Sequence, residues 1–171
     1  MPQIIGLKDA TSDVTRPLRL RSSLGSDFRL LSGDDATAPA FLAMGGDGCI
    51  SVTSNVAPAL CRSMYLALKQ GQPAQAQRLA IIAAPLTAAL FSESNPSPVK
   101  YALSLMKLMS PRVRLPLVEL RAESKTRVET VLAETCAAHP GYLIASVSGR
   151  SRDIVLSVDN ARPRPKLVVA S

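Results

Sequence analysis

A threefold repeat of apolar run, polar loop and helix fills residues 1–71 and constrains the fold more than any other feature. The apolar runs span residues 4–7, 28–31 and 49–52, and the predicted helices span residues 13–24, 36–44 and 58–70. Each predicted helix is followed by a glycine, which readily adopts the left-handed conformation at a helix end. Strands separated by roughly 20 to 25 residues, with helices between them, predict right-handed βαβ units in a parallel sheet. The sequence therefore indicates an α/β fold.

Residues 72–138 carry no further strand signal and are predicted to form a helical region. Helices are expected over residues 74–93, from Pro98 to about residue 106, and over residues 124–138. The first would bend near Pro85, and the last would begin with Ser124 as its cap. It would present Val128, Val131, Leu132 and Cys136 on one apolar face.

Residues 139–171 are expected to form a divergent tail that is partly disordered. The only strand signal in this tail lies at residues 154–156, and the run Arg162-Pro163-Arg164-Pro165 is typical of an extended tail. The chain is thus divided into residues 1–71, 72–138 and 139–171.

Composition excludes several classes of function. The net charge is +7, but much of the excess lies near the C-terminus, and no basic groove with interleaved aromatics argues for nucleic-acid binding. The longest apolar run, residues 79–91, falls short of the ~20 residues of a membrane helix. Three cysteines without paired spacing form no disulfide framework, so a cytoplasmic location is expected.

The sheet predicted for residues 1–71 would have unpaired edges. Three parallel strands leave both lateral edges open, and Ile4 already lies in a strand that no earlier strand could pair with. We therefore expect the chain to begin inside a longer repeat, as a fragment does.

Lys8 follows the first predicted strand directly, at its C-terminal end. In α/β barrels that end of the strands carries the chemistry. Desolvation disfavours the ammonium form of a lysine among apolar residues, and a neutral amine can attack a ketone to form an imine. The alternative is a structural lysine whose stem covers the strand end while its ammonium group reaches water.

Acidic and glycine-rich loops follow the second and third repeats, at residues 32–35 and 45–48. Neither matches a metal-ligand spacing or a phosphate-binding loop, so helix capping by Ser32 or Asp34 and a tight turn are the favoured interpretations. His139 lacks a further zinc-ligand set and is interpreted as a helix-end residue. We expect no metal and no cofactor.

Five segments carry a resemblance to the dihydrodipicolinate synthase family. They are residues 4–11 (IIGLKDAT), 31–37 (LSGDDAT), 45–56 (GGDGCISVTSNV), 94–103 (SNPSPVKYAL) and 114–117 (RLPL). The similarity runs in order from Ile4 to about Ala138. The resemblance implies a partial (β/α)8 TIM barrel, made of the last three βα units, followed by a C-terminal helical region.

The resemblance also implies a chemistry. Lys8 would form a Schiff base with pyruvate, Gly33 would line the same pocket, and Ile50 would offer its backbone to the bound pyruvate. The enamine would condense with aspartate semialdehyde, the lyase reaction of lysine and diaminopimelate biosynthesis. No cofactor would be needed, and the full-length family is expected to form homo-oligomers.

The sequence also departs from the family pattern. The first five strands are absent, and with them the loop that grips the pyruvate carboxylate and the tyrosine that relays protons. None of Tyr65, Tyr101 and Tyr142 lies in a matching motif. Ser12 and Lys107 replace usual glycines, at a cost of ~1 kcal/mol for a left-handed conformation at Lys107.

These departures predict that the chain is inactive alone, because an imine lysine without carboxylate grip or proton relay loses positioning and acid–base assistance. Two alternatives stay open. One is a non-catalytic half-barrel that assembles with a partner, and the other is a different pyruvate-dependent aldolase, such as a sialic-acid lyase.

Overall fold

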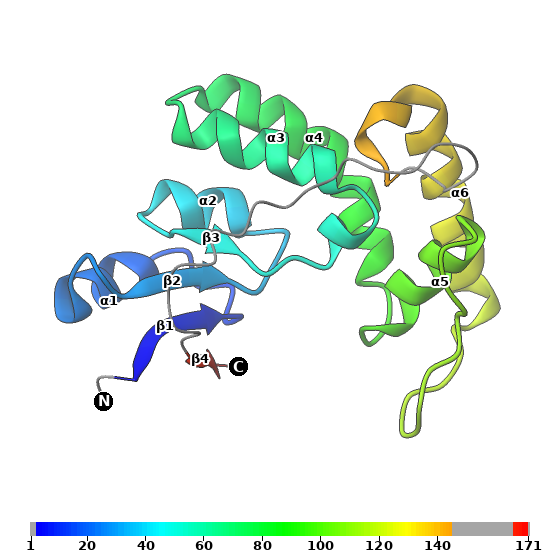
Figure 1. Cartoon of the computed structure of the whole chain (residues 1–171). Helices are drawn as coiled ribbons and strands as arrows, with labels where there is room; N and C mark the ends of the chain where they lie inside the picture. The colour runs from blue at the N-terminus through cyan, green and yellow to red at the C-terminus, as the bar shows by residue number, and fades with distance from the viewer. Residues whose placement is uncertain (1–2, 145–165, 171) are drawn as a thin grey trace.

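The computed structural model describes residues 3–144 and 166–170. Its elements are β1 (Ile4–Asp9), α1 (Arg16–Leu24), β2 (Arg29–Ser32), α2 (Ala38–Ala43), β3 (Gly48–Cys49), η1 (Thr53–Asn55), α3 (Pro58–Lys69), α4 (Pro73–Leu90), α5 (Ser97–Leu105), α6 (Ala122–Ala138), η2 (Pro140–Tyr142) and β4 (Lys166–Ala170). Figure 1 shows the strands at one end of the molecule and α5 and α6 at the other.

The four strands form one parallel sheet in the order β3-β2-β1-β4. The predicted α/β class with parallel βα units is confirmed for β1, β2 and β3. In α1, Pro17 occupies the first turn, where a missing N–H group costs little, and Gly25 ends the helix at φ 77°. Gly45 and Gly71 also have positive φ, at the helix ends where the sequence predicts them.

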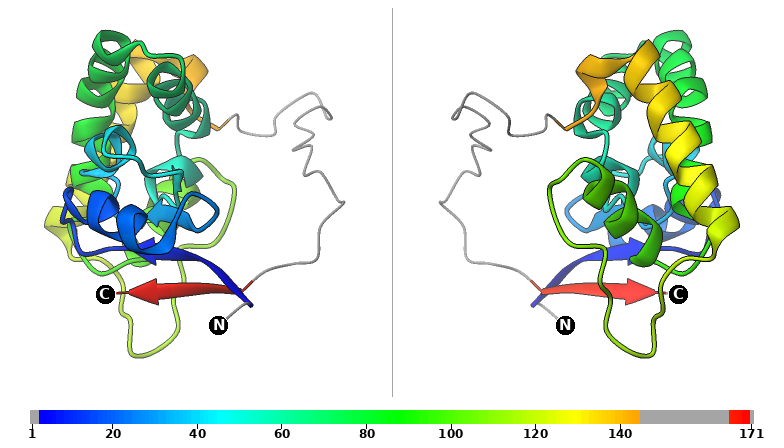
Figure 2. Two further views of the ribbon diagram at one scale, coloured as in Figure 1. Left: turned by 90° about the vertical axis from the view of Figure 1, so that its left-hand side faces the viewer. Right: turned by 90° about the vertical axis from the view of Figure 1, so that its right-hand side faces the viewer.

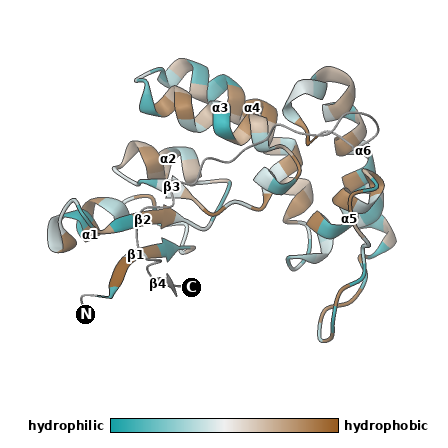
Figure 3. Ribbon diagram, in the orientation of Figure 1, coloured by the Kyte–Doolittle hydropathy of each residue, from teal (hydrophilic) through white to brown (hydrophobic). Residues whose placement is uncertain are grey.

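The side chains of each strand alternate between the two faces of the sheet. Leu7 and Leu30, paired in register, lie on the face that α1 and α2 cover, and they pack with Phe41 in a small core. Lys8 and Leu31, also paired in register, therefore point to the opposite face. Figure 2 shows β1 with helices on only one of its sides, and in Figure 3 β1 runs from a hydrophobic start to a hydrophilic end.

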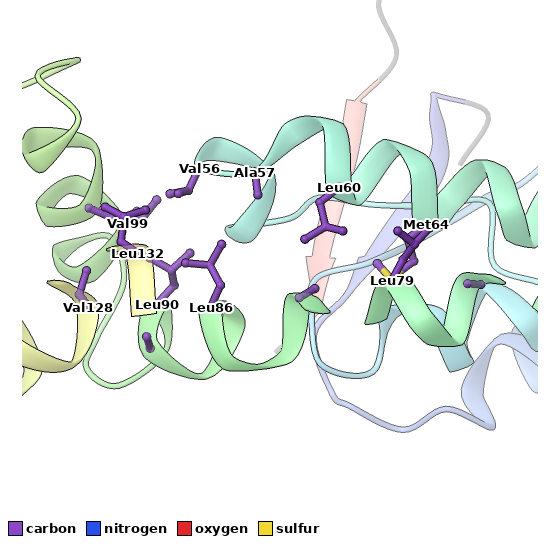
Figure 4. Packing of buried hydrophobic residues seen from close by; sticks show 14 of the residues in the cluster. Val56, Ala57, Leu60, Met64, Leu79, Leu86, Leu90, Val99, Val128 and Leu132 are labelled. Carbon is purple, nitrogen blue, oxygen red and sulfur yellow. The ribbon is translucent and has the colours of Figure 1, made fainter. Parts of the chain in front are cut away.

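A larger core joins the helices from α3 to α6. Leu60 of α3, Leu86 and Leu90 of α4, and Val128 of α6 are fully buried, and Figure 4 shows them spread along the space between these helices. Since burial of each such side chain contributes about 1.5–3 kcal/mol, this core stabilises the helical region. Pro85 lies inside α4, which is a single helix.

Three sequence expectations about local structure were wrong. The third strand ends at Cys49 and not at Val52. Helix α6 begins at Ala122 with Arg121 in the cap position, so Ser124 is a buried helical residue rather than the cap. Cys136 is exposed, although Val128 and Leu132 of the same predicted face are buried.

The prediction that no strand pairs with the outer side of β1 was also wrong, because β4 pairs there. The edges of the described sheet are therefore β3 and β4. The run of residues 166–170 was too short and too close to prolines to indicate a strand by itself. The strand predicted at residues 154–156 lies outside the described residues.

Candidate active site

The carboxyl ends of β1, β2 and β3 meet at one edge of the sheet. The backbone N–H of Gly33 donates to the carbonyl of Asp9 (2.6 Å), and the N–H of Ile50 donates to the carbonyl of Ser32 (2.8 Å). These bonds fix the residues that follow each strand relative to the strand before it. Lys8, Gly33 and Ile50 are therefore brought to the same end of three adjacent strands, where parallel α/β folds place their binding sites.

Gly33 leaves the space that the Lys8 side chain occupies. A Cβ atom added to Gly33 would lie 2.7 Å from Cε of Lys8, closer than real Cβ contacts, and 3.2 Å from its Cγ, tighter than most such contacts. Lys8 is half-buried, and within residues 3–144 its ammonium group neither pairs with a carboxylate nor donates a hydrogen bond. Packing of the aliphatic stem therefore positions the amine. Within the described part of the chain, no ion pair contributes to its position.

Ile50 lies just beyond β3, with 40% of its surface exposed. The Asp35 carboxylate accepts hydrogen bonds from the N–H groups of Val52 (2.7 Å) and Thr53 (3.0 Å), so these groups do not extend the strand. The chain turns into η1 instead. Asp35 thereby determines where the backbone of Ile50 stands, a role that sequence reasoning missed.

A second carboxylate, that of Asp34, connects the loop after β1 to the loop after β2. Ser12 Oγ donates to Asp34 Oδ2 (2.9 Å), although Ser12 has a left-handed φ of 61°. Burial raises the pKa of Asp34, but hydrogen bonds from Thr37, Ser12 and the Ala36 N–H outweigh this and leave the pKa below its ordinary value. Asp34 is therefore ionised at neutral pH. Neither Ser32 nor Asp34 caps α2, since its cap position is Thr37.

Asp9, directly after Lys8, is buried on the helix side of the sheet. Its Oδ1 accepts hydrogen bonds from the N–H (3.0 Å) and Oγ1 (2.6 Å) of Thr11. Arg16 Nε lies 2.9 Å from Asp9 Oδ2, an ion pair without hydrogen-bond alignment. These contacts hold the loop after β1, and with it the carboxyl end that carries Lys8.

A cavity of about 280 Å³ begins at the loop that follows Gly33. Asp34 and Asp35 stand at its wall, and alanines of α4 line much of the rest. In the same wall the Thr53 and Thr87 hydroxyls are hydrogen-bonded to each other at 3.0 Å. The cavity thus offers carboxylates and hydroxyls within a largely apolar lining.

The cysteines near this cavity are not nucleophiles at neutral pH. Burial, followed by the charge of Asp35, raises the pKa of Cys49 to about 12 and that of Cys61 to about 11. Among the residues that the structure describes, no three His, Cys, Asp or Glu side chains are grouped as a metal site. His139 is the C-terminal cap residue of α6, as predicted.

The three tyrosines are engaged away from Lys8. The Tyr65 hydroxyl donates to the Asp47 carbonyl (3.1 Å), Tyr101 donates to Glu129, and the Tyr142 ring lies 5.8 Å from the ring of His139. No helix of the described segments is long and apolar enough to cross a membrane.

Comparison with known proteins gives a consistent result. The model of the dihydrodipicolinate synthetase family matches residues 1–135. The curated 4-hydroxy-tetrahydrodipicolinate synthase of Rhodospirillum centenum is 50% identical over 135 residues, which cover 79% of this chain and 46% of that protein. The chain spans about half the length of the curated relatives it matches.

Solved structures agree with the sequence relatives. The 4-hydroxy-tetrahydrodipicolinate synthase of Methylacidiphilum fumariolicum SolV superposes with a TM-score of 0.75 at 33% identity, over 82% of this chain and 48% of that one. A chloride-inhibited dihydrodipicolinate synthase of Acinetobacter baumannii, solved with pyruvate, gives a TM-score of 0.72 at 39% identity, over 77% of this chain and 45% of that one.

Proposed function

Because the chain belongs to the dihydrodipicolinate synthetase family, we propose that Lys8 is the imine-forming lysine of a pyruvate-dependent lyase of lysine biosynthesis. The contact between Gly33 and the Lys8 stem carries this proposal, since it holds at the carboxyl end of the sheet an amine that pairs with no carboxylate of residues 3–144. Such an amine is a nucleophile for a ketone when it is unprotonated. The pyruvate in the Acinetobacter baumannii structure fits the same chemistry.

The proposed reaction begins with attack of the unprotonated Lys8 amine on the carbonyl carbon of pyruvate. The new C–N bond forms, the carbonyl oxygen leaves as water with one proton from the amine and one from solvent, and a protonated imine results. Loss of a methyl proton gives an enamine, which then forms a C–C bond to the aldehyde carbon of aspartate semialdehyde. The imine acts as the electron sink, so no metal or cofactor is required for these steps.

Gly33 and Ile50 are proposed to bind pyruvate. Gly33 presents bare backbone beside the Lys8 stem, which allows a small keto acid to approach the amine closely. The Ile50 N–H is used by Ser32, so its carbonyl is the backbone group that we assign to the substrate. Asp34 and Asp35 would hold in place the loops that follow β1, β2 and β3 around this pyruvate site.

We further infer that β1, β2 and β3 are three consecutive units of a barrel wall, with Lys8 on the interior face. The helix-free face of β1 and the packing of α1 and α2 on the other face support this assignment. We propose that turnover requires more of the barrel than these residues, because the described tyrosines are engaged elsewhere and a proton relay is needed after the imine forms.

Reductive trapping tests the proposal. The full chain is treated with borohydride and pyruvate, and the digest is examined by mass spectrometry for a carboxyethyl adduct. We expect the adduct at Lys8, its loss in Lys8→Arg, and its retention in Lys69→Arg, which changes an exposed lysine of α3. Adducts spread evenly over the lysines, or none at all, would contradict the assignment.

A further inference from the structure

The outer edge of β1 is paired along its length with the C-terminal strand. The register joins Ile4 to Lys166 and Gly6 to Leu167, and it continues to Asp9 opposite Ala170, with one irregularity between Ile4 and Gly6. Both views of Figure 2 show β1 and β4 running side by side. An edge left without such a partner would present a row of unpaired N–H and C=O groups.

The position of β4 breaks the order of the other strands. From β3 through β2 to β1, each strand lies beside the strand that precedes it in the chain, as in a sequential parallel sheet. Continuing that order, the place beyond β1 belongs to a strand that would precede it. It is filled instead by residues 166–170, which lie outside the part of the chain that the family model matches.

The strand β4 is suited to reversible pairing. It has five residues, and it stands at the end of the strand order, so only β1 pairs with it among the described strands. A short parallel edge strand forms few backbone hydrogen bonds, and parallel pairing is slightly weaker per residue than antiparallel pairing. An added strand binds mainly through its backbone, so an equivalent strand offered in trans would compete for the same edge.

We propose that the outer edge of β1 is an acceptor site for a parallel β-strand, and that the chain's own residues 166–170 fill it in cis. The strand closes the edge beside Lys8, whose register partner is Val169. Any strand from another chain that pairs with β1 must first displace β4. This inference concerns backbone pairing and does not depend on imine chemistry.

Proline substitution in the full chain tests the cis pairing. In a parallel ladder, alternate residues direct their N–H groups to the same neighbour. Val168→Pro and the double variant Leu167→Pro/Val169→Pro therefore remove opposite sets of N–H groups. One variant loses bonds to β1, and the other loses only N–H groups on the outer side, where proline is tolerated. Each variant serves as the matched control for the other.

The readout is amide hydrogen exchange over residues 6–9, followed by mass spectrometry. We expect exchange there to rise about tenfold or more in one variant, with near wild-type exchange in the other. A capped synthetic peptide, Lys-Leu-Val-Val-Ala, should restore protection in the disrupted variant and bind wild type at least about tenfold more weakly. The control peptide carries the same proline substitution as the disrupted variant. It has proline in place of its first valine if Val168→Pro is disrupted, or in place of leucine and the second valine if the double variant is disrupted. This peptide should not bind.

Two results would overturn the proposal. Unchanged exchange along β1 in both variants, with no peptide binding, would show that β4 does not occupy the edge. Protection of β1 that depends on protein concentration, together with a dimer mass in light scattering, would show that the strand is donated by a second copy rather than in cis.

Discussion

Gly33 lies against the aliphatic stem of Lys8 so closely that an added Cβ would stand 2.7 Å from Lys8 Cε. The same hypothetical Cβ would lie 3.0 Å from the Cβ of Ala10, in the loop after β1. A shift of residue 33 toward that loop would therefore not relieve the contact with Lys8. The glycine is thus a spatial requirement of the lysine position.

Gly33→Ala should impair imine formation while leaving the fold intact. The new methyl group must displace the end of the lysine stem, and misplacement of a nucleophile by a fraction of an ångström costs about tenfold or more in rate. The rate of borohydride trapping measures this effect, and circular dichroism checks the fold. Gly141→Ala, where an added Cβ meets nothing within 4 Å, is the control. Trapping of Gly33→Ala at the wild-type rate would contradict the prediction.

Asp47→Asn should destabilise the chain by about 2 kcal/mol at neutral pH, since charge-assisted hydrogen bonds are lost. Asp47 Oδ2 accepts from the Leu30 N–H and from Arg21 Nη2, both at 2.8 Å, and Arg29 lies 3.5 Å from Oδ1. These contacts tie the turn before β3 to β2 and α1. Urea unfolding of both proteins measures the difference.

The same substitution should change the acid stability. Burial raises the pKa of Asp47, but the Leu30 N–H and Arg21 outweigh it, so the folded-state pKa lies below the unfolded value of about 3.9. The stabilisation from Asp47 is therefore present above about pH 4 and is lost as the pH falls through the folded-state pKa. The difference in the free energy of unfolding between the wild type and Asp47→Asn should therefore shrink as the pH falls below about 4. A difference in unfolding free energy that persists or grows on acidification would contradict the prediction that the ionised Asp47 carboxylate stabilises the fold.

Thr87→Val should cost about 1–3 kcal/mol, because it leaves the buried Thr53 hydroxyl without its partner. The double variant Thr53→Val/Thr87→Val removes both hydroxyls and should cost clearly less than the sum of the two single changes. Denaturant unfolding of all four proteins completes the cycle. Strict additivity would show that the pair does not couple η1 to α4.

Lys107→Gly should stabilise the chain by about 1 kcal/mol, since Lys107 has a left-handed φ of 61° after α5. Ser12→Gly, at the same φ, should gain less, because it loses the hydrogen bond to Asp34. Thermal unfolding compares the two. A larger gain for Ser12→Gly would mean that the loop contact contributes nothing.

The sequence predicted those features that local chemistry determines. Gly25, Gly45 and Gly71 mark the helix ends because the left-handed conformation there favours glycine, and the structure confirms positive φ at all three. The left-handed conformation predicted for Lys107 is also confirmed. The membership of the family followed from motifs around Lys8, Gly33 and Ile50, and the comparisons confirm it.

What the sequence did not predict depends on contacts between distant residues. The Asp35 carboxylate, 17 residues before Val52, takes the N–H groups that would have lengthened β3. Likewise, β4 exists through pairing with β1 at the other end of the chain. No local period or propensity carries such information, so the strand end and the fourth strand were both missed.

The nucleophilic role of Lys8 is tested most directly by nuclear magnetic resonance of the full chain with pyruvate labelled at its carbonyl carbon. No reductant is added, so only an imine formed at equilibrium gives a signal shifted from that of the ketone. We predict this signal for the wild type and its absence in Lys8→Ala. An imine signal of equal strength in Lys8→Ala, or none in the wild type at saturating pyruvate, would contradict the account.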